Sequence, residues 1–171
     1  MITFMEQNKT ISLFSDGSVN PQLKIGFSAY LLLDNNNLNE NHQILQKNIQ
    51  SKRFENTSST KLELEGLLWA LSSIKNHHAT INVYTDCQNI LTLLKRRERL
   101  EQNNYLTQKG TNVKNEELYK AFYKLIDQLS CHFIKVKGHQ KTATKNEIDK
   151  IFTLVDRNAR QELRQYISTL S

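Results

Sequence analysis

Apolar and polar residues follow two different periods along the chain, and each period predicts a type of secondary structure. Short apolar runs that end at polar or glycine-containing turns predict β-strands, whereas apolar residues spaced three or four apart predict helices. Strands are predicted at residues 11–14, 27–33, 44–49, 81–85 and 133–136, and helices at 60–75, 89–95, 116–129 and 146–170. Residues 96–115 are polar and follow neither period, so no element is predicted there.

The order of these elements, β-β-β-α-β-α-α-β-α, predicts an α/β fold. Three consecutive strands joined by short polar segments are typical of an antiparallel meander, and helical connections permit the later strands to be parallel. We therefore expect a five-stranded mixed sheet flanked by helices. Five glycines and one proline form no linker-like stretch, so we expect one domain over residues 1–171, with residues 1–10 as a short N-terminal extension.

Composition argues against several classes of protein. Hydrophobic residues make up 38% of the chain and charged residues 23%, which provides enough apolar surface for a buried core. No apolar run approaches the roughly 18 residues of a membrane span, and residues 1–10 lack the apolar segment of a signal peptide. Cys87 and Cys131 have neither zinc-site nor disulfide-framework spacing. We expect a cytoplasmic protein with reduced thiols and no membrane partner.

Positive charge is concentrated in the second half of the chain. The first 94 residues hold 7 Lys and Arg against 8 Asp and Glu, whereas the remaining residues hold 16 against 9. With a pI near 9.3, this excess favours a polyanionic partner such as nucleic acid. Solubility alone is the alternative explanation of the same excess.

Three acidic residues, Asp16, Glu63 and Asp86, lie where strands end or helices begin. Ligands of α/β folds bind where the carboxyl ends of strands open into a shared crevice. If the first and fourth strands are parallel neighbours, Asp16 and Asp86 meet at one edge of the sheet. The structural alternatives are that Asp16 is a turn residue and that Asp86 caps the next helix.

Glu63 also has a structural alternative. Thr60 and Glu63 have the S/T-x-x-E spacing of a helix capping box, which would explain the glutamate without a catalytic role. At 100° per residue, however, Glu63 lies at the margin of the apolar helix face that contains Leu64, Leu67 and Leu71. Both interpretations of Glu63 remain open on the sequence.

Five short segments, in this order, resemble the type 1 ribonuclease H family. They are D-G-S at 16–18, L-E-L at 62–64, T-D-C-Q at 85–88, V-K-G-H at 136–139 and D-R-N-A-R at 156–160. The resemblance extends over nearly the whole chain from residue 11. It implies a ribonuclease H-like fold and an endoribonuclease that hydrolyses the RNA strand of RNA/DNA hybrids with divalent metal held between four carboxylates.

The metal that this resemblance implies agrees with the residue types. An all-carboxylate site favours Mg²⁺, with Mn²⁺ as a substitute, and two ions together stabilise the attacking and leaving oxygens of a phosphodiester. The first three carboxylates are Asp16, Glu63 and Asp86. We expect Asp156 to be the fourth because of its D-x-x-A-R context, whereas its spacing from the G-H pair at 138–139 favours Asp149. These two candidates lie about 10.5 Å apart along one helix, so only one can join the site.

Other roles are also implied by the resemblance. His139 matches a loop histidine that assists proton transfer or product departure. Candidate substrate contacts are Ser18, Asn20, Thr60, Gln88, Lys95, Arg96 and Arg97. The last three fall where some members carry a basic protrusion for the DNA strand, and a solvated helix with internal charge pairs is the alternative.

Two other functions remain to be distinguished from an RNA/DNA-hybrid endoribonuclease. One is a binding module for hybrids or double-stranded RNA that does not cleave them. The other is a DNA nuclease or resolvase on the same scaffold, because one fold can carry several chemistries. The carboxylates argue against the binding module, because binding a polyanion gains nothing from an acidic cluster. We expect the protein to be a monomer.

Overall fold

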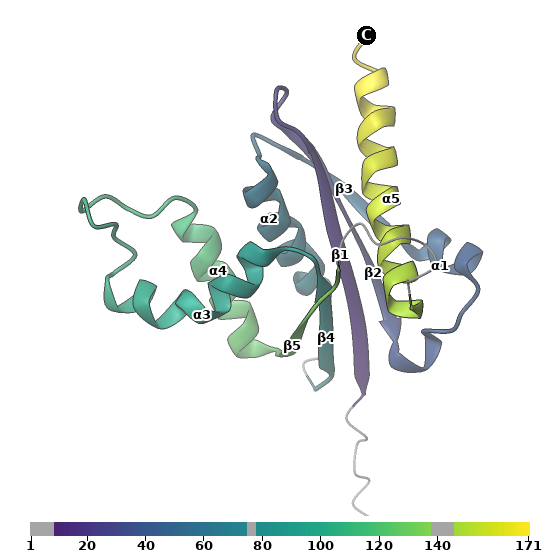
Figure 1. The fold of residues 1–171 in the computed structure, drawn as a ribbon, viewed down its shortest axis with the longest axis horizontal. Coiled ribbons are helices and arrows are strands. Elements are labelled where there is room, and N and C mark those ends of the chain that lie inside the picture. Colours follow the sequence, from purple (N-terminus) through teal and green to yellow (C-terminus); the bar gives the residue numbers. More distant parts are fainter. Residues whose placement is uncertain (1–8, 75–77, 138–145) are drawn as a thin grey trace, which may run out of the picture.

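A five-stranded mixed sheet carries helices on both faces in the computed structural model, which describes residues 9–74, 78–137 and 146–171 (Figure 1). The strands are β1 (Thr10–Asn20), β2 (Ile25–Asp34), β3 (Gln50–Glu55), β4 (Thr80–Thr85) and β5 (Ser130–Lys135). The helices are α1 (His42–Asn48), α2 (Ser59–Ser72), α3 (Gln88–Gln102), α4 (Glu116–Gln128) and α5 (Glu147–Ser168), with a short 3-10 turn η1 at Asn35–Asn37. None of the helices in these ranges is long and apolar enough to cross a membrane.

The strand order is β3-β2-β1-β4-β5. Strands β1, β2 and β3 pair antiparallel, whereas β4 pairs parallel with both β1 and β5. The predicted fold class is therefore confirmed: a meander forms one side of the sheet, and helical crossovers return the chain to parallel strands on the other. The parallel pairing of β1 and β4 decides where the candidate carboxylates meet.

The third predicted strand was wrong in its position. Residues 44–49 lie mainly in α1, and the third strand is β3, at residues 50–55. The Asn41 side chain begins α1 by accepting a hydrogen bond from the backbone N–H of Gln43 at 2.8 Å. Leu45 is buried against α5 while Ile44 is exposed, so one helical face, rather than one strand face, supplies the packing.

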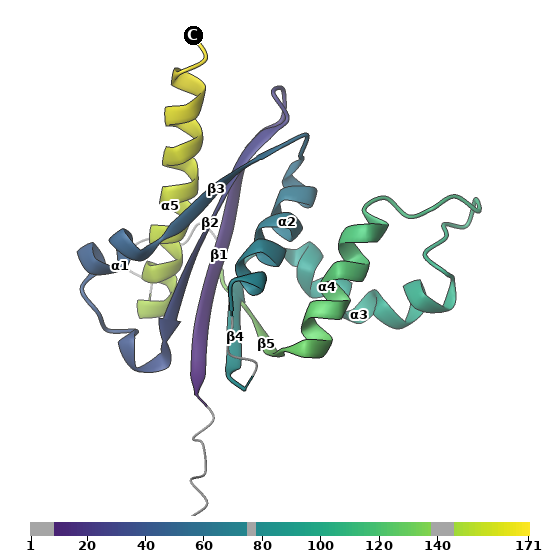
Figure 2. The same cartoon turned by 180° about the vertical axis from the view of Figure 1, so that it is seen from behind.

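The sheet has one apolar core on each side. Leu13 and Val83 point to the face covered by α2, α3 and α4, whereas Phe14 and Tyr84 point to the face covered by α5 and α1. The rings of Phe14 and Tyr84 stack with their centres 4.7 Å apart. Figure 2 shows α5 and α1 on the opposite side of the sheet from α2 and α4. These two layers hold the central strands, and the residues at their ends, in a fixed position.

The segment at 96–115, for which the sequence predicted no element, begins as helix and continues as loop. Helix α3 extends to Gln102, so it is longer than the predicted helix at 89–95. The chain then runs away from the sheet before it returns to α4 (Figure 1). Leu106 and Asn112 form a β-bridge within this excursion, which gives the loop its hairpin shape.

Candidate active site

Asp16 lies within β1, at the point where β4 no longer accompanies that strand. The last pair in the β1–β4 ladder is Phe14 with Tyr84, whereas Asp16 still pairs with Ala29 in β2. Asp16 is therefore a strand residue rather than a turn residue. Its carboxylate is buried, with 6% of the residue exposed, and accepts a hydrogen bond from the Gly17 N–H at 2.9 Å.

Glu63 reaches the same edge of the sheet from the second turn of α2. This helix begins at Ser59, with the Ser58 hydroxyl accepting a hydrogen bond from the Lys61 N–H at 3.3 Å. The cap is therefore Ser58, and the capping-box explanation of Glu63 is wrong. Glycine at position 66 allows α2 to lie directly on β2, because a Cβ there would collide with the side chain of Ser28. This close approach sets the position of Glu63 over β1.

Asp86 follows the last residue of β4 directly. The N-cap residue of α3 is Cys87, whose backbone N–H donates to the Thr85 hydroxyl at 3.0 Å. The helix-capping explanation of Asp86 is therefore wrong as well. Because β1 and β4 are parallel neighbours, Asp86 emerges beside Asp16, as predicted.

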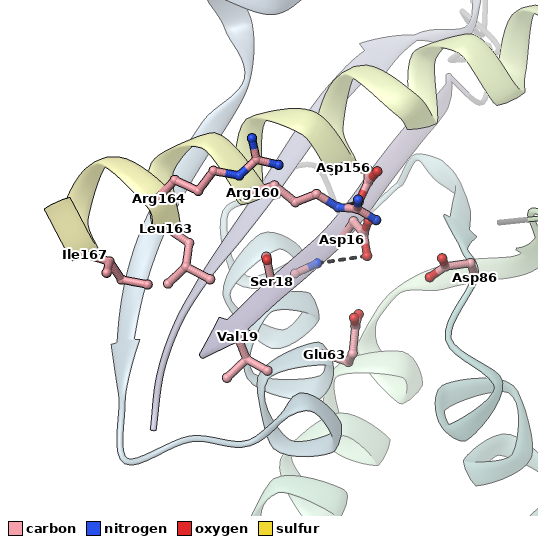
Figure 3. A pocket seen from close by; sticks show the side chains of 11 residues that line it. Asp16, Ser18, Val19, Glu63, Asp86, Asp156, Arg160, Leu163, Arg164 and Ile167 are labelled. Carbon is pink, nitrogen blue, oxygen red and sulfur yellow. Dashed lines mark hydrogen bonds and ion pairs between the residues drawn. The ribbon is translucent and has the colours of Figure 1, made fainter. Parts of the chain in front are cut away.

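The three carboxylates converge from β1, α2 and the end of β4 (Figure 3). One oxygen atom from each of Asp16, Glu63 and Asp86 lies within 4.8 Å of the others. Asp156 of α5 approaches from the opposite face of the sheet, and its carboxylate is near enough to Asp16 to contribute to the raised pKa of that residue. All four residues line a cleft of about 510 Å³.

Burial and mutual repulsion keep protons on this cluster. Burial, followed by the charges of Glu63 and Asp86, raises the pKa of Asp16 to about 9. Burial and the charges of Asp86 and Asp156 raise the pKa of Glu63 to about 8. Such an arrangement is unfavourable for carboxylates alone and favourable for a cation that neutralises them. Its oxygen-only donor set fits a hard divalent metal ion, so the cluster is able to bind one.

Asp149 occupies a different place, in the first turn of α5. Its backbone N–H donates to the Asn146 side chain at 2.9 Å, and its carboxylate accepts from the Asn146 backbone N–H at 3.1 Å. This reciprocal pair is a capping box. Asp149 does not line the cleft, whereas Asp156 does, so the geometry of α5 brings Asp156 to the other three carboxylates.

Comparison with known proteins decides the family. The sequence model of the RNase H family matches residues 8–164. The chain belongs to the RNase H family. A protein named Ribonuclease H from Thermoanaerobacter sp. (strain X514) is 29% identical over 114 residues, which cover 65% of this chain and 73% of that protein. A second protein named Ribonuclease H, from Clostridium botulinum, is 31% identical over 102 residues, which cover 58% of this chain and 68% of that protein.

A solved structure supports the fold independently. The prototype foamy virus protease-reverse transcriptase matches 90% of this chain with a TM-score of 0.68 and 16% identity. The match covers 20% of the viral chain, so this chain shares its fold with one part of that larger protein. Family membership and the acidic cluster together identify the chain as a nuclease of the ribonuclease H type.

The predicted substrate contacts of this RNase H occupy different environments. Ser18 lines the carboxylate cleft, but Asn20 accepts hydrogen bonds from the N–H groups of residues 22 and 23 and so holds the β1–β2 turn. The side-chain oxygen of Gln88, at the start of α3, accepts a hydrogen bond from Lys135 Nζ at 2.9 Å. Thr60 lines a small separate pocket between α2, α3 and α4. His139 lies outside the described residues.

The predicted basic contacts of α3 also differ from one another. Lys95 is exposed, and Arg96 lines the same small pocket as Thr60. Arg97 donates to both carboxylate oxygens of Asp127 in α4, at 2.6 and 2.7 Å, and to Glu101 at 2.8 Å. Arg97 therefore joins α3 to α4, and only its pair with Glu101 is a charge pair within α3 of the kind that the alternative predicted.

Replacing Arg97 with glutamine is expected to lower the melting temperature by about 1–3 °C, because a bidentate pair between two helices is lost. The Michaelis constant for a nucleic-acid substrate should change by less than about twofold, since the Arg97 fork is already occupied by Asp127. Thermal melting and steady-state kinetics measure both. Lys150→Gln is the matched control, with the same charge change at an exposed position of α5 that does not line the cleft. A raised KM with an unchanged melting temperature would contradict this structural role.

Two charged residues of the cleft were not predicted from the sequence as site residues. Arg160 and Arg164 line the cleft beside the carboxylates, on the same helix as Asp156. Arg160 Nε donates to Asp156 at 2.9 Å. The available signal was their spacing, because residues four and eight positions after Asp156 lie on nearly the same helix face.

Proposed function

We propose that this RNase H hydrolyses the RNA strand of RNA/DNA hybrids at the carboxylate cleft, with Mg²⁺ as its resident cation. The observation that carries the proposal is the convergence of Asp16, Glu63 and Asp86 within 4.8 Å, with Asp156 beside them. These four residues would hold the metal. The implied number of ions is two, with Mn²⁺ as a substitute. When bound, divalent metal stabilises the charge that develops on the attacking and leaving oxygens of a phosphodiester.

The protein's own residues position this chemistry. Asp16 is fixed within a buried strand, and its hydrogen bond from the Gly17 N–H restricts rotation of the carboxylate. Glu63 and Asp86 are held by α2 and by the end of β4, so the cluster is supported by both apolar cores. Arg160 keeps Asp156 oriented through its Nε–H. His139 would accept or return a proton during turnover, as the family resemblance implies.

The choice of substrate rests on the family and on charge. A net charge of +6 favours a polyanion, and two arginines, Arg160 and Arg164, line the cleft. The 2′-OH is the group by which a protein distinguishes RNA from DNA at one position. A cytoplasmic location, one domain and a monomeric state complete the proposal.

A cleavage assay tests this function on one nucleotide sequence prepared as RNA/DNA hybrid, double-stranded RNA, single-stranded RNA and double-stranded DNA. We expect RNA to be cut in the RNA/DNA hybrid, and not in double-stranded RNA or single-stranded RNA, with no cleavage of double-stranded DNA. Cleavage should require Mg²⁺, be restored by Mn²⁺ and fall below detection in EDTA. Gel analysis of labelled strands gives both the strand and the position of cleavage.

The same experiment separates the two other candidate functions. Tight binding of the hybrid with no cleavage in either metal would point to a binding module. Cleavage of the DNA strand would point to a DNA nuclease on the same fold. Either result would overturn the proposed activity.

A further inference from the structure

The C-terminal half of α5 carries two arginines along the wall of the carboxylate cleft. Asp156, Arg160 and Arg164 follow one another at intervals of four residues, and all three line the cleft. Figure 3 shows both arginine side chains extending along α5 toward Asp156. This direction is the usual one for side chains in an α-helix. The result is a carboxylate followed by two guanidinium groups along one helix face.

The two arginines differ in what they contact. Arg160 is paired with Asp156 through a 2.9 Å ion pair, so part of its charge is neutralised within the protein. Arg164 is exposed, and in the part of the chain that the structure describes it has no ion pair. A cation near the carboxyl end of a helix can serve the helix dipole, but the last turn of α5 contains no basic residue. The helix dipole therefore does not account for Arg164.

The spacing of the two arginines makes their positive charges repel each other in the protein without substrate. Like charges four residues apart on a helix repel each other, which makes the pair unfavourable without a ligand. An anion lying across both groups would reverse that effect. Leu163 and Ile167 line the same end of the cleft, and apolar neighbours reduce the access of water to a bound ion pair.

We propose that Arg164 binds the substrate phosphate next to the one that is cleaved, an inference that rests on the proposed function of the cleft. Guanidinium presents a planar fork of donors that matches two oxygens of a phosphate group. One turn of helix separates Arg164 from Arg160, about 6 Å along the axis, which is comparable with the spacing of consecutive phosphates along a strand. Arg164 is thus a substrate-binding residue that sets the strand's path past the carboxylates.

The test compares Arg164→Gln with Arg157→Gln, which makes the same charge change at an exposed position of α5 that does not line the cleft. Binding of a labelled RNA/DNA hybrid is measured in EDTA by fluorescence anisotropy over a range of salt concentrations. For Arg164→Gln, we expect an approximately five-fold weaker affinity at low salt and a salt-dependence slope reduced by about 0.9, the value for one lost phosphate contact. Arg157→Gln should change the slope by less than about 0.3.

Kinetics and a conservative variant complete the test. With Mg²⁺, Arg164→Gln should raise KM about five-fold and change kcat by less than about twofold, because it removes binding rather than the carboxylates. Arg164→Lys should restore most of the salt slope through its charge. Equal effects of Arg164→Gln and Arg157→Gln would overturn the inference, because they would show that only net charge matters. The absence of hybrid binding by the unsubstituted protein would overturn it as well.

The binding and kinetic measurements distinguish failure of the proposed nuclease activity from failure of the proposed phosphate contact. A protein that binds the hybrid with the expected dependence on Arg164 but never cleaves it would refute the nuclease activity and leave the phosphate contact standing. A protein that cleaves the hybrid with unchanged KM and salt slope in Arg164→Gln would refute only the phosphate contact. Melting curves check that both variants fold, which the exposure of the two arginines leads us to expect.

Discussion

Replacing Asp16 with asparagine is expected to abolish hybrid cleavage, with a loss in kcat of at least about 10³-fold, and to stabilise the metal-free protein. The loss of activity follows from removing the most buried member of the carboxylate cluster. The gain in stability follows from the same burial, because a neutral amide in this position neither loses hydration of a charge nor repels Glu63 and Asp86.

The stability effect has a definite pH dependence. The pKa of Asp16 is raised from 3.8 to about 9 by burial and by neighbouring carboxylates, so the folded state binds a proton more tightly than the unfolded state. The contribution of Asp16 to the free energy of unfolding of the metal-free protein should therefore be most favourable below about pH 4. This contribution should decrease as the pH rises toward 9. Glu63, with a pKa raised to about 8, acts in the same direction.

Thermal melting in EDTA at pH 5 and pH 8 measures this dependence. At pH 8 we expect Asp16→Asn to melt about 3–8 °C above the unsubstituted protein, with a smaller difference at pH 5. Mg²⁺ should raise the melting temperature of the unsubstituted protein and have less effect on the variant. Glu162→Gln, which removes a carboxylate of α5 outside the cleft, is the control. An Asp16→Asn protein that is active, or less stable in EDTA at pH 8, would be inconsistent with a strained metal site.

The convergence of Asp16 and Asp86 could be predicted because it depends on local features of the chain. Both residues follow apolar runs, and the helical connection between the third and fourth strands permits β1 and β4 to be parallel neighbours. Glu63 could be placed only as far as the margin of a helix face. Its contact with the cluster depends on how closely α2 approaches β2, which Gly66 decides.

The elements that the hydrophobic pattern predicted at the wrong positions are stabilised by contacts between residues far apart in the sequence. Strand β3 lies at the sheet edge with mostly exposed residues, so it lacks the apolar alternation by which strands are predicted. Helix α1 is stabilised by Leu45 against α5 and by a hydrogen bond between His42 Nε2 and the Glu147 carboxylate, two residues that are 105 positions apart. The pairing of Arg97 with Asp127, 30 residues away, could not be predicted from spacing for the same reason.

Asp156→Asn and Asp149→Asn form the second informative pair, because they remove equal charges seven residues apart on one helix. Asp156 lines the cleft beside Asp16, whereas Asp149 caps the first turn of α5. We expect Asp156→Asn to reduce kcat by about 10²- to 10³-fold with little effect on folding. Asp149→Asn should retain activity within about threefold, because asparagine can still accept the hydrogen bond from the Asn146 N–H.

The effect of Mg²⁺ on thermal melting separates a role in metal binding from a role in helix capping. Loss of Asp156 should reduce the Mg²⁺-induced rise in melting temperature, because one carboxylate of the cluster is missing. Loss of Asp149 should lower the melting temperature slightly and equally with and without Mg²⁺, because a helix cap does not depend on the cation. The opposite ranking, with Asp149→Asn inactive and unresponsive to Mg²⁺ while Asp156→Asn stays active, would assign the fourth carboxylate to Asp149. That assignment would require α5 to enter the cleft about two turns nearer its N-terminus than it does in this structure.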